Sequence, residues 1–170
     1  MNAMIFQAIN GTANTSGLID FIGKFFADYL LYIAVLFFIV LFFINKTRLM
    51  VIAIGISVFL SRIVITEPLK RIFHIARPYV SIDGVKKIVG ENGDYFSFPS
   101  GHASVFFAIA TAIFCFNKKW GIVSFIIAIL VGVARIYVGV HWPIDVVAGA
   151  LIGILSGIVV NKFIIKKRNS

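Results

Sequence analysis

Long apolar blocks dominate the chain, and polar side chains gather in the stretches between them. The block Tyr29–Ile44 contains no charged or amide side chain. Further apolar blocks follow at residues 49–65, 103–116, 120–133 and 144–160. About 20 helical residues cross a bilayer, so each block with its flanks is long enough to span. The apolar–polar alternation of strands is absent from the sequence. The pattern predicts an all-α membrane protein with five transmembrane helices.

Two segments depart from this pattern. Residues 1–28 mix apolar side chains with Asn, Gly, Thr and Ser, and the helical spacing of apolar residues in Leu18–Ala27 predicts an interfacial helix. Residues 66–98 form the one long polar connection, which we interpret as an external loop. We therefore expect one domain, residues 1–170, with an N-terminal interfacial segment at 1–28.

The placement of charge orients the predicted bundle. The formal charge of +9 could indicate a nucleic-acid partner, but half of the basic residues sit in two short connections and at the C-terminal end. They are Lys46 and Arg48, Lys118 and Lys119, and Lys162, Lys166, Lys167 and Arg168. With five spans these segments share one side, which the positive-inside rule makes cytoplasmic. This predicts a cytoplasmic C-terminus, an outward-facing 66–98 loop and no nucleic-acid partner.

The first polar segment at the outer face pairs two cations. Lys70 and Arg77 are seven residues apart, which on a helix ending at Pro78 places them on one face. Cations that reach the lipid headgroups are the alternative interpretation. Glu67 is interpreted as structural and could pair with Lys70 or Arg71. His74 is interpreted as interfacial, with a contact to the substrate as the alternative.

The second segment opens the third apolar block. Ser100 is a natural N-cap, and Gly101 lets a ligand approach the backbone closely. The free N–H groups and the helix dipole would then face an anion. A capped helix start explains Ser100 alone, but it gives no reason for an imidazole at His102.

The third segment links the last two blocks and contains Arg135, His141 and Asp145. Pro143 suits the first turn of a helix, so the Asp145 carboxylate can accept a hydrogen bond from one ring nitrogen of His141. The other nitrogen would then be unprotonated and nucleophilic. A carboxylate in a membrane helix is costly, which marks Asp145 as functional.

The combined set admits two kinds of chemistry. The two histidines and Asp145 could bind a metal such as zinc. However, Lys70, Arg77 and Arg135 would repel a divalent ion, and they suit the oxygens of a transferring phosphoryl group. One histidine could attack phosphorus while the other protonates the leaving oxygen. The sequence favours phosphoryl transfer without a metal or other cofactor.

The three segments resemble the signature of a known family. Lys70-x6-Arg77-Pro78, Pro99-Ser100-Gly101-His102 and Arg135-x5-His141-x3-Asp145 are similar to the three motifs of the type 2 phosphatidic acid phosphatase superfamily. The resemblance implies that His141 is the nucleophile and forms a phosphohistidine, that Asp145 orients it, and that His102 is the general acid. It also implies that the phosphate oxygens contact Lys70, Arg77, Ser100, Gly101 and Arg135, with no metal.

One position departs from that signature. The third motif usually begins with Ser-Arg, whereas Ala134 precedes Arg135 here. One hydroxyl contact to the phosphate is therefore lost or supplied elsewhere.

The resemblance also suggests a substrate class. The opening residues resemble those of small bacterial undecaprenyl-diphosphatases, and other short members are lipid A 1-phosphatases and phosphatidylglycerophosphate phosphatases. We expect a lipid phosphate or diphosphate as substrate, a bacterial cytoplasmic membrane, a site at its outer face and no obligatory protein partner. The alternatives are an anionic-lipid binding or transport protein that uses the cations as a clamp, vanadium haloperoxidase chemistry, and a soluble phosphoester substrate.

Overall fold

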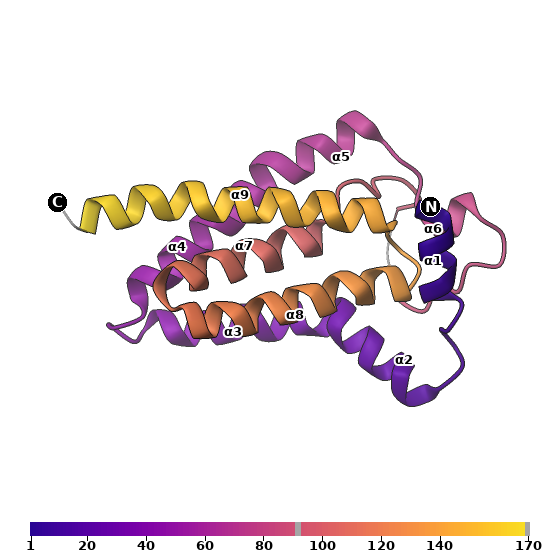
Figure 1. The fold of residues 1–170 in the computed structure, drawn as a ribbon, viewed down its shortest axis with the longest axis horizontal. Helices are drawn as coiled ribbons and strands as arrows, with labels where there is room; N and C mark the ends of the chain where they lie inside the picture. Colours follow the sequence, from indigo (N-terminus) through magenta and orange to yellow (C-terminus); the bar gives the residue numbers. More distant parts are fainter. Residues whose placement is uncertain (91–92, 169–170) are drawn as a thin grey trace.

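A computed structural model describes residues 1–90 and 93–168, and within these ranges the chain is helical and contains no strand. The elements are α1 (Asn2–Asn10), α2 (Gly17–Lys24), the π-helical η1 (Phe25–Tyr29), α3 (Leu30–Phe42), α4 (Arg48–Val58), the π-helical η2 (Phe59–Thr66), α5 (Glu67–Phe73), α6 (Pro78–Ser81), α7 (Gly101–Phe116), α8 (Lys118–Tyr137) and α9 (Pro143–Arg168). Figure 1 shows α3, α4, α7, α8 and α9 running along the long axis, with α1 lying across one end. The all-α prediction is confirmed.

Among the described residues, four stretches are long and apolar enough to cross a membrane: Gly17–Phe42, Arg48–Ser81, Lys118–Tyr137 and Pro143–Ile164. The remaining apolar helix, α7, has 16 residues, which gives a length of about 24 Å at 1.5 Å per residue. That is shorter than the hydrocarbon core of a bilayer. Most side chains of α7 are buried, because it packs against α4, α8 and α9.

The N-terminal part differs from the prediction. The segment Leu18–Ala27 is helical, but the helix continues through η1 into α3, so Gly17–Phe42 is one run of 26 residues. No proline interrupts this run, and Gly23 is held against the Tyr137 ring, so nothing ends the helix at Ala27. The separate N-terminal helix is α1 instead.

The first motif also differs from the prediction. Lys70 lies on α5, but that helix ends before His74, which has left-handed dihedral angles of φ 45° and ψ 41°. The His74 ring stacks on Tyr95, with 4.8 Å between ring centroids. Arg77 is extended, as expected for the residue before a proline, and Pro78 begins α6. The prediction of one helix face carrying Lys70 and Arg77 is therefore wrong.

A seam of small residues joins α9 to α7. Gly149, Gly153 and Gly157 recur at four-residue spacing on α9, and a Cβ atom added to any of them would press on α7. At Gly153 it would lie 2.8 Å from the backbone nitrogen of Ala108. Small residues at this spacing let two membrane helices approach closely. The seam fixes α9 against the start of α7, where the second and third motifs meet.

We expect Gly153→Ala to destabilise the protein by about 1–3 kcal/mol, because the added methyl meets backbone rather than a movable side chain. Thermal unfolding in detergent measures the effect. Gly55→Ala on α4 is the matched control, since no atom lies within 4 Å of its added Cβ. Equal melting temperatures for the two variants would contradict close packing at the seam.

Candidate active site

The three motifs meet at one end of the bundle, where α7 begins, α8 ends, α9 begins and α1 lies across (Figure 1). Six of the predicted side chains are buried there, namely Lys70, Arg77, Ser100, Arg135, His141 and Asp145. Gly101 is buried as well, and His102 is half-buried. The fold thus brings the predicted residues together although they come from distant parts of the sequence.

The third motif brings His141 and Asp145 together, but without the predicted hydrogen bond between them. Nδ1 of His141 lies 3.4 Å from Oδ2 of Asp145, which is within ion-pair distance but outside hydrogen-bond geometry. The same Oδ2 accepts hydrogen bonds from Ser97 Oγ at 2.5 Å and from the Trp142 backbone N–H at 2.9 Å. Two donors therefore fix the carboxylate on the Nδ1 side of the ring, which leaves Nε2 for chemistry.

The surroundings of His141 keep its ring neutral. The side chain is 1% exposed, and this burial lowers its pKa well below the usual 6.5. The positive charge of Arg135 lowers the pKa further, followed by Lys70, Arg77 and His102. A neutral imidazole has a free lone pair, which is the form a nucleophile needs.

Backbone carbonyls orient the cations of the first motif. Lys70 Nζ donates to the Phe96 carbonyl at 2.7 Å. Arg77 donates through Nε to the Gly93 carbonyl at 2.9 Å and through a terminal nitrogen to the Val140 carbonyl at 3.0 Å. These carbonyl oxygens hold both cationic side chains in place at the end of the bundle where the three motifs meet.

Arg135 is held by Asp28, which is not among the predicted site residues. Its guanidinium donates to Asp28 Oδ1 at 2.8 Å and to the Ala27 carbonyl at 3.2 Å, both on η1. The arginine is fully buried, so a partner of opposite charge is needed. The available signal was the isolated carboxylate of Asp28 between apolar residues, because such a charge is costly in a membrane.

Ser100 is the N-cap of α7, as predicted, and its backbone N–H donates to the Asp145 carbonyl at 2.9 Å. Its hydroxyl, however, makes no capping hydrogen bond. Within the described part of the chain this buried Oγ has no hydrogen-bond partner at all. A buried hydroxyl of this kind at a helix N-terminus can donate to a phosphate oxygen.

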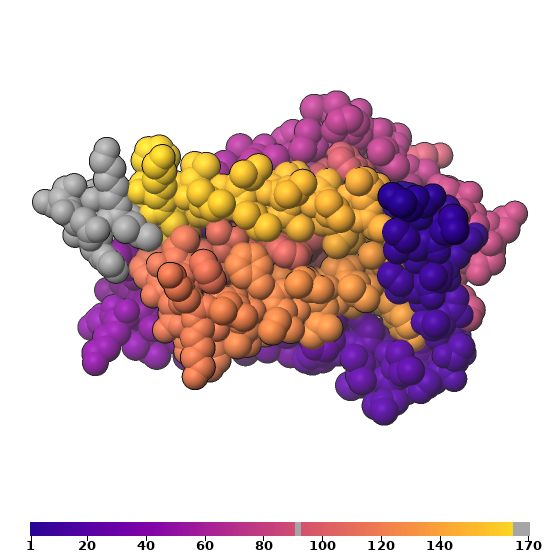
Figure 2. Space-filling model, in the orientation of Figure 1, coloured from indigo at the N-terminus to yellow at the C-terminus, as the bar shows by residue number. Residues whose placement is uncertain are grey.

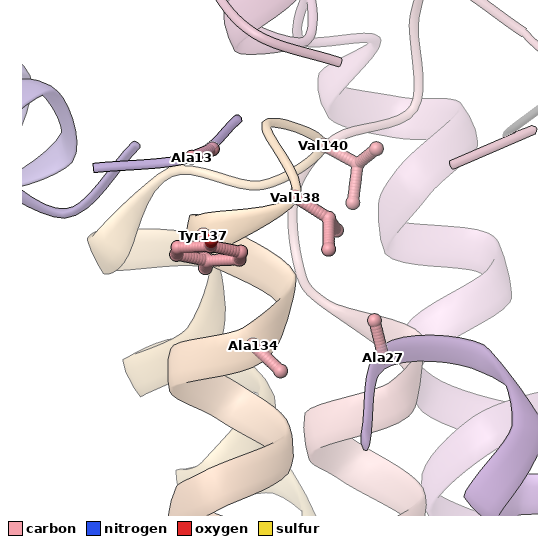
Figure 3. Close-up of a cluster of buried hydrophobic side chains, with 6 residues drawn as sticks. All are labelled: Ala13, Ala27, Ala134, Tyr137, Val138 and Val140. Carbon is pink, nitrogen blue, oxygen red and sulfur yellow. The ribbon is translucent and has the colours of Figure 1, made fainter. Parts of the chain in front are cut away.

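Ala134 packs in an apolar cluster. The cluster also contains Ala13, Ala27, Tyr137, Val138 and Val140. Figure 3 shows the Ala134 methyl on α8 pointing toward the Ala27 side, below Val138. A serine at position 134 would place a hydroxyl among these apolar groups at a cost in stability. The departure from the family signature therefore coincides with an apolar contact between α8 and η1.

The residues that support the His141–Asp145 pair could not be recognised from the sequence. Ser97 lies in a polar loop and carries no distinctive pattern around it. The indole of Trp142 donates to the Ala76 carbonyl at 3.1 Å, and its ring contacts Phe6 of α1 with 5.3 Å between centroids. Figure 2 shows α1, in indigo, covering this end of the molecule. The N-terminal helix thus supports the loop that holds Asp145.

The residues that could bind a metal are few. Among the residues that the structure describes, no three His, Cys, Asp or Glu side chains are grouped to hold an ion. The expectation of a site that works without a metal stays a prediction.

Known proteins are similar to this chain in sequence and in fold. An undecaprenyl-diphosphatase from Sulfolobus acidocaldarius is 36% identical over 155 residues, covering 89% of this chain and 73% of the relative. The "bacitracin transport permease protein BcrC" from Bacillus licheniformis is 34% identical over 162 residues, covering 94% and 79%. The crystal structure of Aquifex aeolicus LpxE superposes with a TM-score of 0.83 at 34% identity, covering 95% of this chain and 94% of LpxE.

The fold and these similarities define a membrane-spanning phosphatase, a hydrolase acting on phosphoric ester or anhydride bonds. Residues 47–169 match the PAP2 superfamily, and the chain belongs to it. The family resemblance inferred from the three motifs is confirmed.

Proposed function

We propose that the chain removes the terminal phosphate of a lipid diphosphate, such as undecaprenyl diphosphate, through a phosphohistidine at His141. The observation that supports this best is a buried, neutral imidazole held beside Asp145 and surrounded by cations. A site that only clamps an anion has no need of a neutral nucleophile. Lipid A 1-phosphate and phosphatidylglycerophosphate remain candidate substrates.

In the first step, Nε2 of His141 attacks phosphorus and an N–P bond forms. The bond between phosphorus and the leaving oxygen breaks, and its electron pair stays on that oxygen, which takes a proton from His102. The phosphoryl oxygens are held by Lys70, Arg77, Arg135, the Ser100 hydroxyl and the Gly101 N–H. These groups stabilise the charge that develops in the transition state.

In the second step, water attacks the phosphohistidine. His102, now neutral, accepts a proton from the water as the new P–O bond forms. The N–P bond breaks, its electron pair returns to Nε2 of His141, and inorganic phosphate leaves. Asp145 stabilises the positive charge that the His141 ring carries while phosphorylated.

An apolar groove supports a lipid as the substrate. It lies between α3, α4 and α7 and has a volume of about 490 Å³. Its lining includes Leu31, Val35, Phe38, Val58, Val105 and Ile109. Val105 lies one helical turn from Gly101, so a hydrocarbon chain in the groove would place its headgroup at the start of α7. A soluble phosphoester would leave this groove unused.

We further propose that α7 is the fifth transmembrane helix and that the site faces outward. Because α7 is surrounded by other helices, it does not need to match the full thickness of the lipid. The short α3–α4 and α7–α8 connections lie at the end opposite α1 (Figure 1). Lys46 lies in the first connection, Arg48 begins α4, and Lys118 and Lys119 begin α8. The positive-inside rule places that end, with the C-terminus, in the cytoplasm.

The decisive experiment is a substrate panel. Detergent-purified protein in EDTA is expected to release phosphate from undecaprenyl diphosphate, with slower release from lipid A, phosphatidylglycerophosphate and phosphatidate. One relative is named a transport permease, and the clamp alternative predicts lipid binding with no phosphate release. Equal kcat/KM for a water-soluble phosphoester and its lipid counterpart would contradict entry through the groove.

The neutral state of His141 can be measured directly. Because its pKa is lowered, the neutral ring persists as pH falls, and we expect it unprotonated at pH 6, where an ordinary histidine is mostly charged. The chain has 3 histidines, so ¹⁵N imidazole shifts of the substrate-free protein are resolvable, and His141→Ala assigns the signal. Activity should then fall toward alkaline pH as His102 loses its proton. A His141 titration midpoint at or above 6.5 would contradict the neutral nucleophile.

A further inference from the structure

An arginine interrupts the second apolar stretch at a place that the three motifs do not cover. Arg62 lies in η2, inside the stretch Arg48–Ser81. A cation within a membrane helix is costly, and π-helical segments are frequent at functional sites. The position therefore calls for a specific role, and the contacts of Arg62 suggest one.

The guanidinium of Arg62 lies against the phosphate-binding end of α7. A Cβ atom built on Gly101 would lie 2.8 Å from Nε and 2.9 Å from Cζ of Arg62. Only glycine leaves room for this contact, because any side chain would displace the guanidinium. Gly101 thus has a second use besides the close approach of a ligand to its backbone.

The ion pair with Glu67 leaves most N–H donors of the Arg62 guanidinium available. A terminal nitrogen of Arg62 pairs with Oε2 of Glu67, the first residue of α5. Glu67 was expected to pair with Lys70 or Arg71 instead. A guanidinium has five N–H donors, so one carboxylate does not exhaust it. The Arg62 side chain is 35% exposed, so part of it faces outward beside the site.

The arginine also marks the end of the apolar groove. Val58 lines the groove four residues before Arg62 on one continuous helix, and Val105 lines it four residues after Gly101 on α7. Both walls of the groove therefore lead, within about one turn, to the contact between Arg62 and Gly101. A lipid chain in the groove passes this contact before its headgroup reaches His141.

We infer that Arg62 binds the phosphate that stays on the lipid when the terminal phosphate of a lipid diphosphate is transferred. The inference rests on the proposed function and specifies its substrate: two phosphates in sequence, the outer one at His141 and the inner one at Arg62. Planar guanidinium groups bind phosphate oxygens through paired hydrogen bonds, which a lysine cannot reproduce. Arg62 is a specificity-determining residue, selecting diphosphates over monophosphates.

The test compares a prenyl diphosphate with the prenyl monophosphate of the same chain length, on the full-length protein in detergent. Arg62→Ala is expected to lower the ratio of kcat/KM for the diphosphate over kcat/KM for the monophosphate by roughly tenfold to a hundredfold. This is the effect expected when one charge-assisted hydrogen-bonded contact is lost. Arg62→Lys should give an intermediate ratio. Arg71→Ala is the control, since Arg71 is an exposed cation on the neighbouring α5 and should leave the ratio unchanged.

Each outcome is decisive. If Arg62→Ala leaves the ratio unchanged, whether or not activity falls on both substrates, the assignment is overturned. The proposed phosphatase function is then unaffected. If Arg62→Ala does not fold, the ratio for Arg62→Lys decides, and an unchanged value overturns the assignment. Wild-type protein that hydrolyses neither substrate overturns the proposed function and this inference with it.

Discussion

We expect His141→Ala to lower the turnover of lipid phosphates by roughly 10⁴-fold or more, because no other group can form the covalent intermediate. The ring is 1% exposed and its removal leaves a small cavity, so the variant should remain folded. Phosphate release, thermal unfolding and trapping of an acid-labile phosphoenzyme from labelled substrate measure the three consequences.

His74→Asn is the matched control for that substitution. His74 occupies a variable position of the first motif, between Lys70 and Arg77, and packs against Tyr95 and Phe96. Asparagine tolerates its left-handed backbone, so activity should stay within a few-fold of wild type. Undiminished phosphate release by His141→Ala would overturn the assigned nucleophile.

The second large effect is expected for Asp145→Asn, with a loss of roughly 10³–10⁴-fold in kcat. The amide is similar in shape, but it removes the negative charge that stabilises the His141 ring during transfer. It also replaces one acceptor oxygen with an NH₂ donor. Ser97 and Trp142 both donate to a single carboxylate oxygen of Asp145, so the amide is a poorer partner for this pair of donors. Steady-state kinetics together with a thermal melt separate this catalytic loss from unfolding.

Ser97→Ala provides the comparison for Asp145→Asn. It deletes one donor to the carboxylate but keeps the charge and the Trp142 hydrogen bond. We expect about a tenfold loss or less from this single contact. If Asp145→Asn retained as much activity as Ser97→Ala, the carboxylate charge would not be what orients and stabilises His141.

The parts of the molecule that the sequence predicted are those governed by local rules. Apolar blocks become helices because the membrane leaves the backbone no other partner. Pro143 starts α9 and Ser100 caps α7, as their backbone preferences require. Once these helices stand side by side, the spacing of the motifs is enough to gather His102, His141 and Asp145 at one end.

The parts that escaped prediction depend on contacts between distant segments. The break at His74 is coupled to stacking on Tyr95, which lies beyond the next helix. Asp28 and Arg62 each interrupt an apolar block, and nothing local shows that one reaches Arg135 and the other Gly101. A charge in a membrane helix is a local signal that something is paired, but it does not say with what.

The position of α1 limits how far the chain can be shortened for expression. The match to the PAP2 superfamily begins at residue 47, so a domain boundary drawn there would discard the first helix. Phe6 is fully buried against Trp142, the residue whose backbone holds the carboxylate of Asp145. Met1, by contrast, is 93% exposed. Expression vectors can therefore add an affinity tag ahead of Met1, but shortening the chain to its family boundary removes part of the scaffold of the site.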